Sequence, residues 1–217
     1  MLAKDPGRWW PTLIVVTDNT YVESAIVEDE ALVAARGRAQ ELGAPTISPA
    51  VGAMLALLAR AAGAKSVVEV GTGVGVSGLW LLAGMADDGV LTTIDPESEY
   101  QQAAREAFTA ADIPVGRTRL INGSPTEVLP RLADASYELV FLDGEVLDHP
   151  RYVTEAIRIL RPGGVVVLHQ ADAMDPSHTG PVADAVREAA LVVADDDRFL
   201  PVIIPLGTGL LAAAKAR

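Results

Sequence analysis

The stretch Val67-Val68-Glu69-Val70-Gly71-Thr72-Gly73-Val74-Gly75-Val76-Ser77 decides the fold of this chain. It begins with a valine-rich run of the kind that forms a buried strand, and three glycines at alternate positions follow directly. Glycine lets a backbone turn sharply and approach a ligand, because it carries no Cβ. The residues after the last glycine predict a helix, whose first N–H groups would face an anionic group. We therefore expect a strand, a tight ligand-binding turn and a helix.

Strands and helices alternate after this turn. The sequence predicts strands over residues 66–70, 90–94, 117–121, 138–142 and 165–168, and helices over residues 76–85, 97–111, 126–133 and 152–160. Two further strand-like pieces, 198–204 and 210–214, have only residues 205–209 between them. A connection that short cannot contain a crossover helix, so these two strands are expected to be antiparallel.

The N-terminal part of the chain has a different character. Residues 22–43 predict one helix that ends at Gly43 and Pro45, and residues 50–62 predict a second helix. We therefore predict an α/β fold that is doubly wound and Rossmann-like. It has a mostly parallel seven-stranded sheet, a C-terminal antiparallel hairpin and an N-terminal helical extension. One domain would span residues 1–217, with the extension in 1–45 and the core in 46–217.

Composition excludes several classes of protein. The chain has 217 residues, and 17 Lys+Arg against 29 Asp+Glu give it a formal net charge of -12, so it lacks the basic field that nucleic-acid binding needs. The absence of cysteine excludes a disulfide scaffold and a thiol nucleophile. No run reaches the ~18 apolar residues of a membrane helix, and residues 9–16 make a poor signal peptide. We expect a cytoplasmic protein that binds a small molecule, and neither nucleic acid nor membrane.

Two carboxylates flank the glycine turn. Glu69 lies near the end of the first strand, and Asp95 follows the second. An acidic residue in the place of Asp95 can bind both hydroxyls of a ribose, although it can also cap the helix predicted from residue 97. In a shifted frame, Gly73-Val74-Gly75-Val76-Ser77-Gly78 also matches a dinucleotide fingerprint. An NAD(P)-dependent oxidoreductase is therefore one alternative, but the sequence holds no Tyr-x-x-x-Lys pair to serve it.

Five motifs in order along the chain carry a family resemblance. They are Val68-Glu69-Val70-Gly71-Thr72-Gly73, Thr93-Ile94-Asp95-Pro96-Glu97, Val140-Phe141-Leu142-Asp143, Leu160-Arg161-Pro162-Gly163-Gly164-Val165 and Pro205-Leu206-Gly207-Thr208-Gly209-Leu210. In these motifs the chain resembles the class I O-methyltransferases of the catechol and caffeoyl-CoA type, over roughly residues 43–214. The resemblance implies an enzyme that transfers a methyl group from S-adenosyl-L-methionine (SAM) to a hydroxyl of a small phenolic acceptor.

The resemblance also assigns roles to individual residues. It implies that the amino-acid end of SAM is held by Ile47, Glu69, Gly71, Thr72, Gly73 and Ser77. It implies that the ribose and adenine are held by Asp95, Pro96, Gly123 and Ser124. Asp143 matches an acidic residue that the SAM pocket shares with a divalent cation.

The chain departs from the family at the catalytic positions. The family usually continues with Ala-Asp-Lys, whereas Gly144-Glu145-Val146 follow Asp143 here, so the lysine that helps to deprotonate the acceptor is missing. The Asp-Asn pair that completes the cation site is replaced by His169-Gln170. Asp143, His169 and Gln170 would form a mixed nitrogen and oxygen site, which suits several transition metals better than Mg²⁺.

His169 has two other interpretations. Histidine is the residue type that titrates near neutral pH, so His169 together with Asp143 is a candidate for proton removal from the acceptor. The third interpretation is a strand-end histidine that only binds the backbone.

The missing lysine and the replaced Asp-Asn pair also favour an alternative function, that of a SAM-binding protein that has lost catalysis.

The remaining histidines and tryptophans give weaker predictions. His149 and His178 are each expected in a surface loop. Trp9 and Trp10 lie in an apolar N-terminal segment, and aromatic residues are enriched in protein interfaces. We therefore expect a homodimer that forms through this segment.

Overall fold

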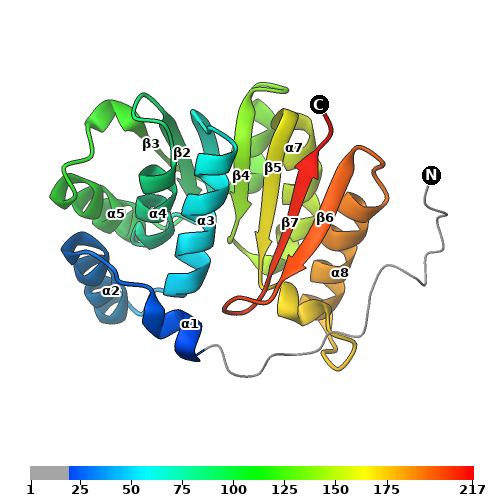
Figure 1. Cartoon of the computed structure of the whole chain (residues 1–217), viewed down its shortest axis with the longest axis horizontal. Coiled ribbons are helices and arrows are strands. Elements are labelled where there is room, and N and C mark those ends of the chain that lie inside the picture. The colour runs from blue at the N-terminus through cyan, green and yellow to red at the C-terminus, as the bar shows by residue number, and fades with distance from the viewer. Residues whose placement is uncertain (1–19) are drawn as a thin grey trace.

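The computed structural model describes residues 20–217, and Figure 1 shows their arrangement. One sheet has the strand order β3-β2-β1-β4-β5-β7-β6. Its strands are β1 (Ser66–Val70), β2 (Val90–Asp95), β3 (Thr118–Asn122), β4 (Tyr137–Leu142), β5 (Leu160–His169), β6 (Phe199–Ile204) and β7 (Leu210–Lys215). β1 to β5 pair in parallel, whereas β7 is antiparallel to both β5 and β6. The predicted fold class and its C-terminal hairpin are confirmed.

Helices cover both faces of this sheet. They are α1 (Thr20–Ala25), α2 (Glu30–Leu42), α3 (Pro49–Ala61), α4 (Val76–Gly84), α5 (Ser98–Ala110), α6 (Pro125–Val128), α7 (His149–Ile159) and α8 (Pro181–Ala194). Residues of α2 to α5 pack against one set of alternate strand side chains, and residues of α7 and α8 pack against the other set. The central strands are buried on both faces, as their continuous apolar sequences require. Within the described chain, no helix has the length and apolarity needed to cross a bilayer.

The N-terminal extension differs from its prediction. The single helix expected over residues 22–43 is two helices, α1 and α2, with residues 26–29 between them. The break has a local cause, because the Asp29 side chain accepts a hydrogen bond from the Leu32 N–H at 2.9 Å and so caps α2. α2 ends before Gly43, as predicted, and this glycine has the left-handed conformation.

Two other elements also depart from the sequence prediction. The helix expected over 126–133 is only the single turn α6, followed by a 3₁₀ turn over Leu129–Arg131. No helix was predicted between the strands at 165–168 and 198–204, whereas α8 occupies residues 181–194. α8 begins with Pro181, which a helix tolerates in its first turn because no N–H is needed there.

The topology brings distant residues to one edge of the sheet. The parallel strands β1, β2, β4 and β5 all end there, and β6 and β7 are joined by a turn at the same edge. Figure 1 shows this edge at the bottom of the view, where α1 and the start of α3 also lie. Ligands of open α/β sheets bind at the carboxyl ends of the strands, so a binding site is expected at this edge.

Candidate functional site

The glycine turn between β1 and α4 has a backbone that only glycine adopts easily. Gly71, Gly73 and Gly75 have positive φ angles of 92°, 48° and 92°. At Gly71 the space is also closed, because a Cβ would lie 2.6 Å from the carbonyl oxygen of Asp143. The turn therefore passes directly beside the end of β4, and Ser77 lies buried in the first turn of the following helix.

Glu69 is a buried carboxylic acid at the base of this turn. Its side chain is 0% exposed, and its Oε2 accepts a hydrogen bond from the Thr93 hydroxyl at 2.6 Å. Its Oε1 has no hydrogen-bond partner among the described residues. Burial raises the pKa of Glu69 to about 7, against the opposing effect of the Ser77 and Thr93 hydroxyls. A buried acceptor without a donor is costly, and a cationic ligand group would satisfy it.

The raised pKa of Glu69 predicts how stability depends on pH. Because the pKa is higher in the folded than in the unfolded chain, the folded state is favoured below about pH 4.5, and this advantage is lost as the pH rises to about 7. The shift corresponds to about 3 kcal/mol in the free energy of unfolding. We expect Glu69→Gln to remove this loss, as measured by urea unfolding at pH 4.5 and pH 8. The exposed Glu188→Gln is the control, and equal pH dependence in Glu69→Gln and wild type would contradict the assignment.

Asp95 joins the glycine turn to the next strand–helix unit. Its Oδ2 accepts a hydrogen bond from the Gly73 N–H at 3.0 Å, and its Oδ1 accepts one from the Glu97 N–H at 2.9 Å. α5 begins at Ser98 with Glu97 in the capping position, so Asp95 is not the N-cap of this helix. Its side chain is held at the edge of the sheet, one strand away from Glu69.

The other predicted cofactor residues lie around this turn. Thr72 is buried, and its hydroxyl is hydrogen-bonded to that of Thr93 at 2.7 Å. The Gly123 N–H donates to the carbonyl oxygen of Asp95 at 3.1 Å, which brings residues 123–124 beside the end of β2. Pro96 is exposed at the same edge, and its carbonyl oxygen accepts from the Asn122 amide at 3.0 Å.

The segment 45–48 closes the opposite side of the turn. The carbonyl oxygen of Pro45 lies 3.8 Å from where a Cβ on Gly73 would be, and Ile47 is buried. The structure therefore brings together segments from four distant parts of the sequence, which end around one glycine turn.

Asp143 and His169 form a hydrogen-bonded pair at the ends of β4 and β5. The distance from His169 Nδ1 to Asp143 Oδ1 is 2.6 Å. The other ring nitrogen, Nε2, lies 3.0 Å from the hydroxyl oxygen of Thr208 in the β6–β7 turn. His169 is only 8% exposed, whereas Thr208 is exposed. The third interpretation of His169, a histidine bound only to the backbone, is therefore wrong.

The candidate metal ligands Asp143, His169 and Gln170 are not arranged as an open cation site. Both nitrogens of His169 have hydrogen-bond partners, Asp143 and Thr208, so a cation would have to displace one of them before it bound the ring. Gln170 has a left-handed backbone, with a φ of 62°, at the start of a 3₁₀ turn. Across residues 20–217, no group of three or more His, Cys, Asp or Glu side chains is placed to hold a metal ion.

Thr208 was missed as a site residue, although its motif was noted. Antiparallel pairing sets His169 opposite Leu210, which places the residue two positions earlier beside the imidazole ring. If the register between the last parallel strand and the C-terminal hairpin had been assigned from the sequence, it would have pointed to Thr208.

His149 corrects a second prediction. It was expected in a surface loop, but it is fully buried at the start of α7. Its ring lies 6.1 Å from that of Tyr152, and neither ring nitrogen has a hydrogen-bond partner in the described part of the chain. Burial lowers the pKa of His149 and so favours the neutral ring.

His178 is exposed in a loop, as predicted, and Trp9 and Trp10 lie outside the described residues.

Comparison with known proteins gives a consistent result. A family model described as O-methyltransferase matches residues 17–216. A Mycolicibacterium vanbaalenii protein that bears an O-methyltransferase name is 56% identical over 199 residues, which cover 90% of this chain and 88% of that protein.

Two solved structures are similar along nearly their whole length. A crystal structure from Corynebacterium glutamicum has a TM-score of 0.84 and 34% identity, and the match covers 92% of this chain and 95% of that one. The O-methyltransferase TomG of Streptomyces achromogenes, which is involved in tomaymycin synthesis and was solved in complex with SAM, has a TM-score of 0.82 and 29% identity, with coverages of 92% and 96%.

Proposed function

Since the chain belongs to the O-methyltransferase family, we propose that it binds SAM at the glycine turn and transfers the methyl group to a hydroxyl oxygen of a small molecule. The observation that carries this proposal is the buried Oε1 of Glu69, which has no hydrogen-bond donor among the described residues. The ammonium group of a bound amino acid would satisfy this oxygen. The similarity to TomG, a SAM complex, supports the choice of cofactor.

The residues around the turn fit the rest of that cofactor. Gly71, Thr72, Gly73 and Ser77, with the backbone of Ile47, would hold its amino-acid end at the N-terminus of α4. Asp95 would accept hydrogen bonds from the ribose hydroxyls, since a carboxylate has more acceptor sites than its two present bonds use. Pro96, Gly123 and Ser124 would lie against the adenine.

The proposed chemistry needs alignment and removal of one proton. Bound SAM supplies a methyl group activated by its sulfonium. His169 is the proposed general base, because Asp143 holds the Nδ1 side of the ring and leaves Nε2 to accept a proton. The hydroxyl of the acceptor would replace that of Thr208 beside Nε2, so that its proton passes to the imidazole. No step in this mechanism uses a metal ion.

A phenolic acceptor suits a site of this kind. Phenols, with pKa values near 10 as in tyrosine, ionise far more readily than aliphatic alcohols. A histidine that acts without the family lysine is therefore better able to deprotonate a phenol than an aliphatic alcohol.

We further propose that residues 1–45 and 46–217 work as one domain in the cytoplasm.

Calorimetry with S-adenosylhomocysteine (SAH) and NAD distinguishes the competing functions. We expect SAH to bind and NAD to give no heat of binding. Methyl transfer to a panel of catechols, flavonoids and simple phenols should follow. NAD binding without SAH binding would favour the oxidoreductase, and SAH binding without transfer to any acceptor would favour a SAM-binding protein that has lost catalysis.

We also propose that the protein is a homodimer formed through its N-terminal segment. Tyr21 and Val27 are 81% and 89% exposed, and these apolar side chains follow the tryptophan-bearing segment in sequence. Light scattering of the full-length chain should give about twice its mass of 22.7 kDa, and deletion of residues 1–20 should halve that value. A full-length protein that runs as a monomer would contradict the proposal.

A further inference from the structure

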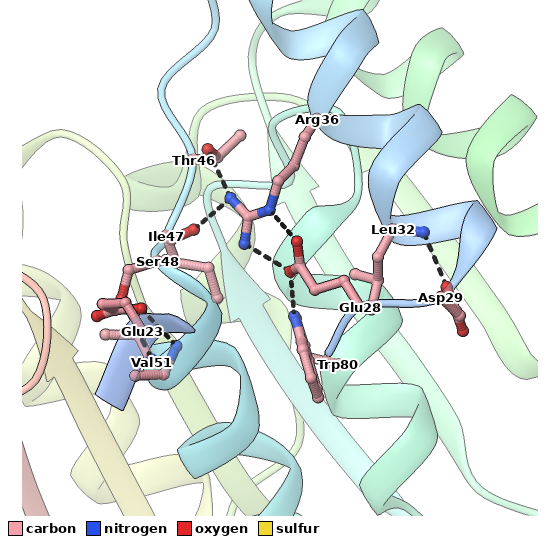
Figure 2. Close-up of polar contacts among 11 residues, drawn as sticks. Glu23, Glu28, Asp29, Leu32, Arg36, Thr46, Ile47, Ser48, Val51 and Trp80 are labelled. Carbon is pink, nitrogen blue, oxygen red and sulfur yellow. Dashed lines mark hydrogen bonds and ion pairs between the residues drawn. The ribbon is translucent and has the colours of Figure 1, made fainter. Parts of the chain in front are cut away.

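Charged residues of the N-terminal extension hold the segment that links α2 to α3. Arg36 Nε and Nη2 donate to the two carboxylate oxygens of Glu28 at 2.6 and 2.8 Å, which makes a two-pronged ion pair. Its Nη1 donates to the carbonyl oxygen of Ile47 at 2.7 Å and to the Thr46 hydroxyl at 3.1 Å. Figure 2 shows the guanidinium between the carboxylate on one side and residues 46 and 47 on the other.

A second glutamate holds the same segment from α1. The carboxylate of Glu23 accepts from the Ser48 hydroxyl at 2.7 Å and from the Ala50 N–H at 2.9 Å. We refer to Glu23, Glu28 and Arg36 as the N-terminal clasp. Residues 46–48 and the first turn of α3 are thus bound by side chains of the extension (Figure 2).

The clasp is also tied to the helix that starts at the glycine turn. The Trp80 indole N–H of α4 donates to Glu28 at 3.2 Å. The ring lies flush against α3, because a Cβ on Gly52 would come within 2.2 Å of it. The Glu28 side chain is 9% exposed and that of Arg36 is 21% exposed, so this ion pair is sheltered from solvent. A sheltered, two-pronged pair fixes geometry better than a single exposed contact.

The segment held by the clasp forms one wall of the candidate site. Pro45 lies against Gly73 of the glycine turn, and the Ser48 hydroxyl lies 3.1 Å from where a Cβ on Gly207 would be. Gly207 precedes Thr208, the partner of His169, in the β6–β7 turn. A shift of residues 45–48 would therefore disturb both the cofactor turn and the loop that carries Thr208.

We infer that the N-terminal clasp is a set of positioning residues for the cofactor, with Arg36 at its centre. By binding residues 46–48, the clasp holds the adjoining Pro45 against the glycine turn in the conformation that SAM requires. This inference rests on the proposed function, because it needs SAM at that turn. Coupling between two sites is reciprocal, so cofactor binding would in turn stabilise the docking of α1 and α2.

The first test is the SAH affinity of clasp variants, measured by calorimetry beside their thermal stability. Arg36→Ala should weaken SAH binding by at least about 5-fold, as expected for coupled sites. Arg36→Lys should lose less, because lysine keeps the charge but not the planar fork. The SAH affinity of Glu28→Gln should also lie between those of the wild type and Arg36→Ala. This second variant keeps the test usable if Arg36→Ala does not fold.

Arg158→Ala is the matched control. Arg158 binds the carboxylates of Glu155 and Asp134 and the carbonyl oxygens of Leu129 and Leu132, and its side chain is 30% exposed. It makes these bonds at the amino ends of the strands, away from the glycine turn. We expect this variant to lose thermal stability but to keep wild-type affinity for SAH.

Hydrogen exchange tests the reciprocal effect without any acceptor. Saturating SAH should slow amide exchange in α1 of the wild type and have no such effect in Arg36→Ala. Wild-type SAH affinity in a folded Arg36→Ala, or exchange of α1 that ignores SAH in the wild type, would overturn the inference while leaving the proposed function intact. A wild-type chain that binds no SAH would overturn both.

Discussion

Replacement of His169 by alanine is expected to lower turnover by about 10²–10⁴-fold, the usual contribution of a positioned general base. The affinity for SAH should change little, because proton transfer belongs to the transition state. The physical basis is the pairing of Nδ1 with Asp143 at 2.6 Å, which orients the ring and leaves Nε2 to face the acceptor. Steady-state kinetics of methyl transfer, with SAH affinity measured in parallel, test this expectation.

His178→Ala is the control for that experiment. His178 is an exposed histidine whose Nδ1 lies 2.9 Å from the carbonyl oxygen of Asp172, so its removal should leave turnover near the wild-type value. Methyl transfer in the wild type should also survive a chelator, since both nitrogens of His169 are engaged without a metal. Full activity in His169→Ala would remove this residue as the base, and total loss of activity in EDTA would show that a cation is required.

Replacement of Asp95 by alanine should weaken SAM binding by about 1–3 kcal/mol, which is roughly a 5- to 150-fold increase in Kd. Two effects add in this variant. The ribose would lose its acceptor, and the N–H groups of Gly73 and Glu97 would lose theirs. Calorimetric titration with SAH measures the sum of the two.

Asp95→Asn separates these effects in part, because the amide keeps one oxygen acceptor but loses the charge. Its affinity should lie between those of the wild type and Asp95→Ala. Asp88→Ala is a suitable control, since it removes a surface carboxylate that pairs with Lys65 at 2.6 Å just before β2 begins. An unchanged dissociation constant in Asp95→Ala would remove this residue from the cofactor pocket.

The elements that the sequence predicts best are those with local signals. The strand, glycine turn and helix around Gly71 follow from consecutive residues, and the antiparallel hairpin follows from the shortness of its connection. The break between α1 and α2 was missed because apolar spacing alone does not show it. Asp29 is a residue type that commonly caps helices, so it was the local signal for a helix start at residue 30. The position of Glu28, by contrast, depends on its contacts with Arg36 and Trp80, which no local pattern predicts.

The site shows the same division between local and long-range information. Glu69, Asp95 and Asp143 could be placed at one edge because each lies at or near the end of a strand predicted to be parallel. Thr208 reaches His169 through strand pairing across 39 positions of sequence, and no local pattern reports that contact. His149 was misplaced for a related reason, since the neighbours that bury it come from other elements of the fold.

The reversed direction of β7 has a practical consequence for handling the protein. Because β7 starts at the turn that carries Thr208 and runs antiparallel to β5, it delivers Arg217 to the edge of the sheet opposite the glycine turn (Figure 1). An affinity tag, a fluorophore or a sensor-chip linkage attached after Arg217 would thus sit at the opposite edge of the sheet from the glycine turn. The C-terminus is therefore a suitable anchor for immobilised binding assays and for screening acceptor libraries.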